Sequence, residues 1–221
     1  MPVESPLRDR RGSGYALIET FRREADGSFI RLDRHLARLE NSARELGFRY
    51  SRAEVEQQLE RLNADGALRV RLELSRDGGL DLAASPFVPL PNGALWRLAI
   101  ARARLDSTDP LRRHKTTRRD LYAAARSEHE GEQIDEVLLL NEAGELAEGT
   151  ITNIFIELAE GILATPPLSS GALPGILRGE LIETGRAVER RLTTDDLSSA
   201  PTIFVGNSLR DLIHARLEHT G

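Results

Sequence analysis

The chain has 221 residues, of which 40% are hydrophobic and 29% are charged, so it can bury a core and is not of the disordered class. A formal net charge of −5 gives no electrostatic footprint for nucleic acid, and the lack of cysteine excludes disulfides, thiolate catalysis and thiolate-bound metals. The N-terminal stretch has no apolar segment typical of a secretory signal, and no run of about 18 apolar residues could span a membrane. We therefore expect a cytoplasmic protein without nucleic-acid or membrane partners.

The first half of the chain predicts a mixture of strands and helices. Residues 15–23 alternate like a strand, and residues 32–48 carry apolar side chains at helical spacing, with Asp33 as the N-cap and Gly47 at the end. A second helix follows from residue 51, where Ser51 and Glu54 form a capping-box pattern. Two further strand patterns, joined by a turn at residues 76–79, predict a hairpin, and residues 95–103 predict another strand.

Residues 106–113 are polar, contain a proline and lack periodicity, which is typical of a connection. We therefore predict a smaller α/β domain at residues 1–106, a linker at 107–113 and a larger domain at 114–221. The larger domain is expected to begin with a helix that ends at Gly131. A strand meander, a helix opened by Pro174 and Gly175, a short capped helix near residue 195 and the closing segment "TIFVGNSLRDLIHARL" follow. Strands and helices in both halves indicate an α/β or α+β fold.

Lys115 is the single lysine among the 30 Lys and Arg residues of the chain. Arginine can replace lysine in surface ion pairs, but it cannot supply a neutral primary amine. Two interpretations of Lys115 remain open from the residues alone: a leftover surface residue, or an amine that forms a Schiff base. The sequence lacks the common dinucleotide, Walker, zinc-protease and nucleophile-elbow motifs, and its histidines show no metal-ligand spacing, so no metal site is expected.

Two glycine-punctuated segments are candidate binding sites. In "SSGALPGILR" (169–178), Gly171, Pro174 and Gly175 precede an amphipathic helix, whose free N–H groups could hold an anion or could simply begin a Pro-capped helix. The segment "VGNSLR" (205–210) ends a strand in small hydrogen-bonding residues. Glu148 stands beside a glycine in the strand meander, where the spacing alone indicates a solvated turn residue.

Five stretches occur in a recognisable order, namely "LIETFR…FIRLDRHLARLENSARELGF", "HKTTRRDLY", "DEVLLLNEAGELAEGTITNIF", "TPPLSSGALPGILR" and "DDLSSAPTIFVGNSLR". In these stretches, which run from residue 17 to 210, the chain resembles the class IV aminotransferase family of fold-type IV pyridoxal-phosphate (PLP) enzymes. That family includes branched-chain and D-amino-acid aminotransferases and aminodeoxychorismate lyases. The resemblance implies an α+β fold with an α/β first domain and a barrel-like second domain, as in D-amino-acid aminotransferase.

The resemblance also implies how the cofactor ring is held. Lys115 matches the lysine that binds PLP as a Schiff base, and Glu148 matches the carboxylate that faces the pyridine nitrogen. The branched-chain enzymes place a tyrosine five residues after the lysine, where this chain has Asp120, so we assign the nearby Tyr122 to the cofactor. We expect the arginines at positions 113, 118 and 119 to lower the pKa of Lys115, and His114 to have a packing or local hydrogen-bonding role.

The remaining implied contacts are with the cofactor phosphate. Arg38 matches the arginine that binds this group. The other implied phosphate contacts are Gly175, Ile176 and Leu177 through their backbone N–H groups, and Asn207 and Ser208 as a second anchor.

Within the family, "HKTTRR" together with "EGTITNIF" is most similar to the lyases. The activity implied is the conversion of 4-amino-4-deoxychorismate to 4-aminobenzoate and pyruvate in folate synthesis. Two alternatives remain: an aminotransferase of branched-chain or D-amino acids, and a catalytically silent binding protein with this fold. The resemblance further implies a homodimer whose active site lies between the domains and near the partner chain.

Overall fold

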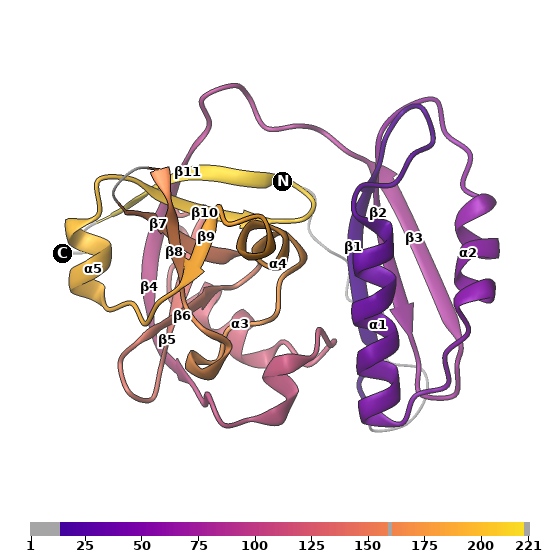
Figure 1. The fold of residues 1–221 in the computed structure, drawn as a ribbon, viewed down its shortest axis with the longest axis horizontal. Coiled ribbons are helices and arrows are strands. Elements are labelled where there is room, and N and C mark those ends of the chain that lie inside the picture. The colour runs from indigo at the N-terminus through magenta and orange to yellow at the C-terminus, as the bar shows by residue number, and fades with distance from the viewer. Residues whose placement is uncertain (1–13, 159–160, 219–221) are drawn as a thin grey trace.

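The computed structural model describes residues 14–158 and 161–218, which form two lobes, each built around its own β-sheet (Figure 1). The smaller lobe has a three-stranded sheet and the larger lobe an eight-stranded, curled sheet. The α+β class and the barrel-like larger sheet expected from the sequence are therefore confirmed. In the part of the chain that the structure describes, no helix is both long enough and apolar enough to cross a membrane.

The smaller lobe consists of β1 (Leu17–Arg23), α1 (Leu32–Leu46), α2 (Arg52–Glu60), β2 (Leu68–Leu74) and β3 (Leu80–Pro86). Its strands pair antiparallel in the order β1-β2-β3. Side chains of β2 alternate between buried and partly exposed, so one face of the sheet packs its leucines into a core shared with α1 and α2.

The ends of the two helices show which capping predictions were right. Gly47 ends α1 in the left-handed region (φ 70°), and the Ser51 side chain accepts a hydrogen bond from the Glu54 N–H at the start of α2, both as predicted. Within the part of the chain that the structure describes, the second bond of the predicted capping box, from the Ser51 N–H to the Glu54 side chain, is not formed. The prediction of Asp33 as the α1 N-cap is wrong. The cap residue is Arg31, at φ 56°, and Asp33 lies in the first turn, where its charge favours the positive end of the helix dipole.

The larger lobe contains the remaining elements, which are β4 (Leu95–Leu105), α3 (Asp120–Ser127), β5 (Glu136–Asn141), β6 (Leu146–Gly149), β7 (Asn153–Glu157), β8 (Leu163–Thr165), α4 (Ile176–Glu183), β9 (Ala187–Glu189), α5 (Thr194–Ser199), β10 (Ile203–Asn207) and β11 (Asp211–Leu217), with short 3₁₀ turns at Pro110–Arg113 and Leu168–Ser170. The strand order is β6-β5-β4-β11-β10-β7-β8-β9. Helix α3 packs on β4 and β5, and α4 packs beside β9 and β10.

The predicted domain boundary at residues 107–113 needs correction. Strand β4 pairs in parallel with both β5 and β11, so it belongs to the larger sheet, although it precedes the predicted linker. The chain passes from one sheet to the other at residues 87–94 (Figure 1). The polar stretch at 107–113 lies within the larger lobe and leads from β4 into the segment that carries Lys115.

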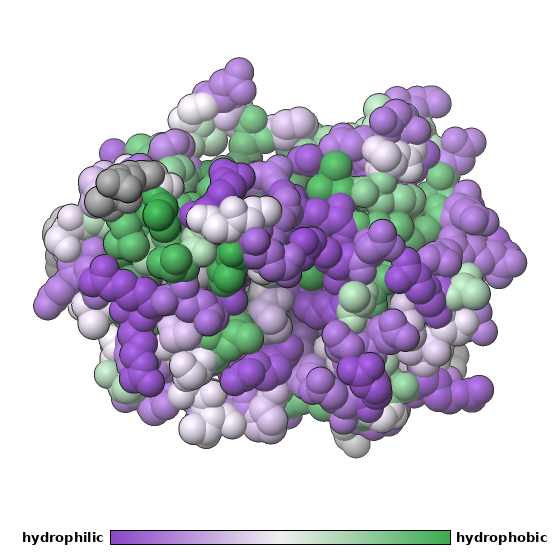
Figure 2. All heavy atoms as spheres, in the orientation of Figure 1, coloured by the Kyte–Doolittle hydropathy of each residue, from purple (hydrophilic) through white to green (hydrophobic). Residues whose placement is uncertain are grey.

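The two lobes contact each other through backbone pairing and through ion pairs. Residues 115–117 pair with the edge of β1: the Ile18 N–H donates to the Lys115 carbonyl (2.9 Å) and the Thr117 N–H donates to the Ala16 carbonyl (2.9 Å). At the start of α1, Arg31 pairs with Glu180 of α4. Figure 2 shows hydrophilic residues gathered on this face where α1 and α4 meet.

Candidate active site

The backbone pairing with β1 places Lys115 between the two sheets. Its side chain is partly buried, and within the residues that the structure describes the ammonium group has no hydrogen-bond or ion-pair partner. The His114 Nδ1 lies 3.0 Å from the Ser42 hydroxyl of α1, so this histidine has the expected hydrogen-bonding role, but with a partner that is distant in sequence. The main chain around Lys115 is thus fixed from both sides, while the amine itself is uncommitted.

The electrostatic surroundings of Lys115 lower its pKa to about 8. Burial is the largest cause, and the positive charges of Arg38 and Arg119 act in the same direction, against the carboxylates Glu19 and Glu148. A lowered pKa was expected, and Arg119 is one of its expected causes. Arg113 and Arg118, which were also expected to lower this pKa, are not among its main causes, and the largest contribution from a charge comes from Arg38, which is distant in sequence.

Arg38 belongs to a buried network that links the lobes. Its Nε and Nη2 donate to the two carboxylate oxygens of Glu19 (2.8 and 2.6 Å), and its Nη1 donates to the Pro174 carbonyl (3.0 Å). His35 Nδ1 lies 2.6 Å from Glu19, and its Nε2 lies 2.8 Å from the Ser208 hydroxyl. The network therefore connects β1 and α1 to the β10–β11 turn and to the loop before α4.

The protonation states in this network follow from its contacts. Burial raises the pKa of Glu19, but the Arg38 charge and the hydrogen bonds from His35 and Arg38 outweigh it and bring that pKa to about 2. Burial lowers the pKa of His35, so its ring is neutral near pH 7. Because Glu19 is ionised and can only accept, His35 Nδ1 carries the proton and its Nε2 accepts from the Ser208 hydroxyl.

Glu148 is a buried carboxylate at the end of β6, only 4% exposed, and not the solvated turn residue that its spacing indicates. The Tyr122 hydroxyl donates to its Oε1 (2.6 Å), and the Leu173 N–H donates to its Oε2 (3.0 Å). Burial raises the pKa of Glu148, while these two hydrogen bonds and the Lys115 charge oppose the increase. Tyr122 therefore lies beside Glu148, and Arg112 in turn donates to the Tyr122 hydroxyl (3.2 Å).

The loop before α4 brings these groups together. Leu173 donates to Glu148 through its N–H and accepts from Asn153 Nδ2 (3.1 Å) through its carbonyl, and Pro174 accepts from Arg38. Gly175 then begins α4, and a Cβ at this position would lie 1.9 Å from Asn153 Oδ1. Glycine is favoured at position 175 because a Cβ there would force the Asn153 side chain to move.

The start of α4 offers unused backbone donors. Ile176 and Leu177 are the first two residues of the helix, and the N–H groups of a first turn have no acceptor within the helix. Among the described residues no other acceptor reaches them. The Asn207 side chain, by contrast, is used within the structure: its Oδ1 accepts from the Leu209 and Arg210 N–H groups, and its Nδ2 donates to the Ile151 carbonyl (3.1 Å).

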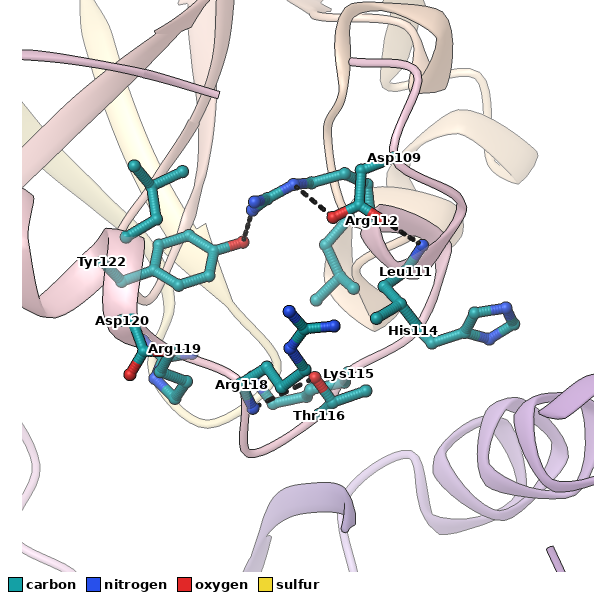
Figure 3. A pocket seen from close by; sticks show the side chains of 12 residues that line it. Asp109, Leu111, Arg112, His114, Lys115, Thr116, Arg118, Arg119, Asp120 and Tyr122 are labelled. Atoms are coloured by element: carbon teal, nitrogen blue, oxygen red, sulfur yellow. Dashed lines mark hydrogen bonds and ion pairs between the residues drawn. The ribbon is translucent and has the colours of Figure 1, made fainter. Parts of the chain in front are cut away.

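A pocket of about 250 Å³ opens at Lys115 (Figure 3). Its lining is rich in charge: four cationic side chains face two carboxylates, Asp109 and Asp120. The apolar part of the lining is small and comes from three leucines, at positions 111, 121 and 173. In the described part of the chain, no group of three His, Asp or Glu side chains could hold a metal ion.

Four residues of this site were not predicted from the sequence, namely Glu19, His35, Arg112 and Leu173. Glu19 and His35 lie in segments that resemble ordinary amphipathic elements, and only their burial reveals them. Arg112 falls in the stretch predicted to be a linker, and Leu173 acts through its backbone. No single-sequence pattern marks such positions.

A family model described as Amino-transferase class IV matches residues 16–217. Because the match covers nearly the whole chain, the protein belongs to the class IV aminotransferase family, whose members are PLP-dependent.

Relatives within the family carry two different activities in their names. A proposed aminodeoxychorismate lyase of Schizosaccharomyces pombe is 29% identical over 192 residues, which are 84% of this chain and 83% of that protein. A crystal structure of 4-amino-4-deoxychorismate lyase from Pseudomonas aeruginosa has 28% identity and a TM-score of 0.81, over 98% of this chain and 88% of that chain. A crystal structure of a proposed amino-acid aminotransferase from Mesorhizobium loti has 51% identity and a TM-score of 0.90, over 93% of this chain and 100% of that chain.

Proposed function

We propose that this protein is a PLP-dependent lyase that converts 4-amino-4-deoxychorismate into 4-aminobenzoate and pyruvate. The observation that carries the proposal is the uncommitted Lys115 amine at the edge of a pocket with an excess of positive charge. The substrate has an amine, which can react at the cofactor on Lys115, and two carboxylates, which the positive charge of the pocket would attract.

The residues around Lys115 fit the cofactor. Lys115 would hold it covalently, and the buried Glu148 would face the ring nitrogen. Arg38 uses three of its five N–H donors within the protein, which leaves two for a phosphate. The free N–H groups of Ile176 and Leu177, at the start of α4 after Gly175, would complete an anion site.

Asn207 and Ser208 would contribute a second anchor through their position in the β10–β11 turn. The Ser208 hydroxyl bonds to His35, and the turn itself is fixed by the Asn207 side chain. The network around Glu19 therefore holds this turn and the Arg38 side chain in fixed positions, because Ser208 bonds to His35 and both His35 and Arg38 bond to Glu19. Tyr122 is proposed to act on the ring end of the cofactor through Glu148, to which its hydroxyl donates.

The reaction requires one proton to be removed and one bond to be broken. PLP, when bound, supplies an electron sink for the carbon that loses its proton. Lys115, with a pKa of about 8, supplies an amine that is neutral in part of the molecules at pH 7, and it removes the proton from the amine-bearing carbon of the substrate. The C–O bond to the neighbouring enolpyruvyl group then breaks, the released group takes up a proton to become pyruvate, and the ring becomes aromatic. No water and no second substrate are consumed.

An aminotransferase is the second candidate, and the 51% identity to a proposed amino-acid aminotransferase favours it. Proteins named as branched-chain aminotransferases also match this chain. The small apolar share of the pocket lining is a poor match for a branched aliphatic side chain, and Asp120 stands where the branched-chain enzymes have a tyrosine. The sequence also lacks the R-x-H pattern of the D-amino-acid enzymes, with "ARARLD" in the comparable strand. These features support the lyase over the transaminase.

A set of parallel incubations distinguishes the lyase from the transaminase. PLP-loaded protein given 4-amino-4-deoxychorismate alone should release 4-aminobenzoate and pyruvate in equal amounts over many turnovers. Parallel incubations with L-leucine or D-alanine and a 2-oxoacid should show little amino transfer. Rapid amino transfer, with no aminobenzoate formed in the first incubation, would show that the protein is a transaminase.

A further inference from the structure

Three arginines line the pocket at Lys115, and two of them are held by the protein itself. Arg119 donates from Nη2 to the Thr150 carbonyl (2.5 Å), and its guanidinium lies 4.6 Å from the centre of the Tyr122 ring. Arg112 donates to the Tyr122 hydroxyl (3.2 Å) and approaches Asp109 at 3.9 Å. Both guanidinium groups therefore have structural contacts that support Tyr122.

The third arginine, Arg118, differs from the other two. Its backbone N–H donates to the Thr116 hydroxyl (3.3 Å), which fixes the main chain three residues after Lys115. Its side chain is exposed and, within the described residues, has neither a hydrogen bond nor an ion pair. Figure 3 shows its guanidinium directed into the pocket and not away from it.

Within the described residues, neither carboxylate of the pocket forms an ion pair with Arg118. Asp109 approaches Arg112 instead, at 3.9 Å, and Asp120 lines the same pocket without pairing with Arg118. The protein as a whole has a formal net charge of −5, so the excess of cationic side chains in this pocket is a local feature. A further positive charge in a pocket that already has an excess of cations is electrostatically unfavourable unless an anion binds there.

We propose that Arg118 is a specificity-determining residue that binds a substrate carboxylate remote from the reacting amine. This inference rests on the proposed function, because it assumes that the substrate amine is directed to Lys115. A guanidinium binds a carboxylate through two parallel hydrogen bonds, a geometry that also fixes the orientation of the ligand. A substrate with its amine at Lys115 thus presents a second charged group to Arg118 at the same pocket.

The test compares binding with turnover in the PLP-loaded protein. Three variants are needed: Arg118→Gln, which removes the charge; Arg118→Lys, which keeps the charge without the planar fork; and Arg113→Gln, a control at an exposed arginine that does not line the pocket. Binding is measured by calorimetry with two dicarboxylates, chorismate and 2-oxoglutarate. Chorismate has a hydroxyl in place of the substrate amine, so it cannot react with Lys115.

The expected result is a selective loss of carboxylate affinity. Arg118→Gln should weaken the Kd of the better-binding dicarboxylate by about tenfold or more, since a charge-assisted contact is lost. Arg118→Lys should lose less, and Arg113→Gln should match the wild type. In steady-state assays the KM should rise by a similar factor, while kcat stays within about twofold, because neither carboxylate of the substrate gains or loses a bond in the reaction.

Two results would overturn the inference: an unchanged Kd and KM in Arg118→Gln, or a wild-type protein that binds neither dicarboxylate. The proposed activity can fail separately. If no aminobenzoate is formed, but 2-oxoglutarate binding falls in Arg118→Gln, the carboxylate site stands and the lyase assignment is lost. If the lyase activity is present and Arg118→Gln retains the wild-type KM, the activity stands and the carboxylate site is lost.

Discussion

Replacing Glu19 with glutamine tests the buried network that joins the two lobes. Glu19 is 1% exposed and accepts both hydrogen bonds of the Arg38 fork as well as one from His35. Glutamine keeps the size of the side chain but removes its charge. Arg38, whose side chain is only 11% exposed, would then remain in the interior without its counterion.

The size of the effect can be worked from the pKa of Glu19. A decrease from 4.5 to about 2 corresponds to a stabilisation of about 3 kcal/mol for the ionised form in the folded protein. Removal of one member of a buried ion pair typically costs about 3–5 kcal/mol. We therefore expect Glu19→Gln to lower the free energy of unfolding by about 3 kcal/mol near pH 7.

The pH dependence has a definite sign. The folded-state pKa of Glu19 lies below its unfolded value, so the unfolded chain binds more protons between these two pKa values. The stabilisation is complete above pH 4.5 and is lost as the pH falls from 4.5 to about 2. His35, whose pKa is also lowered in the folded state, adds a loss of stability that begins at higher pH, as the unfolded histidine becomes protonated.

The assay is urea unfolding of the wild type and Glu19→Gln at neutral and at acidic pH, with Glu183→Gln as the matched control. Glu183 pairs with Arg34 at the surface, so its replacement should have little effect. The difference between the wild type and Glu19→Gln should shrink as the pH falls toward about 2. A difference below about 1 kcal/mol near pH 7, as for an exposed ion pair, would refute the reasoning.

Two further substitutions test the loop and the carboxylate. Gly175→Ala should weaken PLP binding and lower the free energy of unfolding by about 1–3 kcal/mol, because the new Cβ would displace Asn153. Calorimetry measures the binding and urea unfolding measures the stability. The control Gly179→Ala should show neither loss, because, apart from the helix backbone and the adjacent residues, the nearest atom lies 4.0 Å from its Cβ position. Tyr122→Phe removes a hydrogen bond that lowers the pKa of Glu148, so the acid limb of the kcat/KM profile should move to higher pH. An acid limb at the same pH as in the wild type would show that Tyr122 does not affect the ionisation of Glu148.

Local elements of this protein could be predicted from its sequence because their signals are local. The leucine alternation of β2, the apolar stripe of α1 and the left-handed Gly47 each depend on a few neighbouring residues. The resemblance to a family added candidate site residues that these local signals do not indicate, such as Glu148, whose spacing alone indicates a solvated turn residue.

The features missed were those set by distant parts of the chain. The apolar pattern of β4 is compatible with either sheet, and its place in the larger sheet is decided by pairing with β11, more than 100 residues later. Glu19 has the spacing of an ordinary strand residue, and its burial depends on Arg38 and His35 from α1. Tyr122 could be assigned to the site, but its bond to Glu148 depends on the packing of α3 against the larger sheet.

The measurement that most directly tests the account is chemical mapping of the cofactor to Lys115. Because Lys115 is the single lysine of the chain, reduction of the PLP-loaded protein with borohydride should leave a pyridoxyl group on one side chain only. Peptide mass spectrometry should find the group on the peptide that contains residue 115, and Lys115→Ala should lose both the label and the yellow colour. A colourless wild-type protein that remains unlabelled at Lys115 in excess PLP would contradict the account.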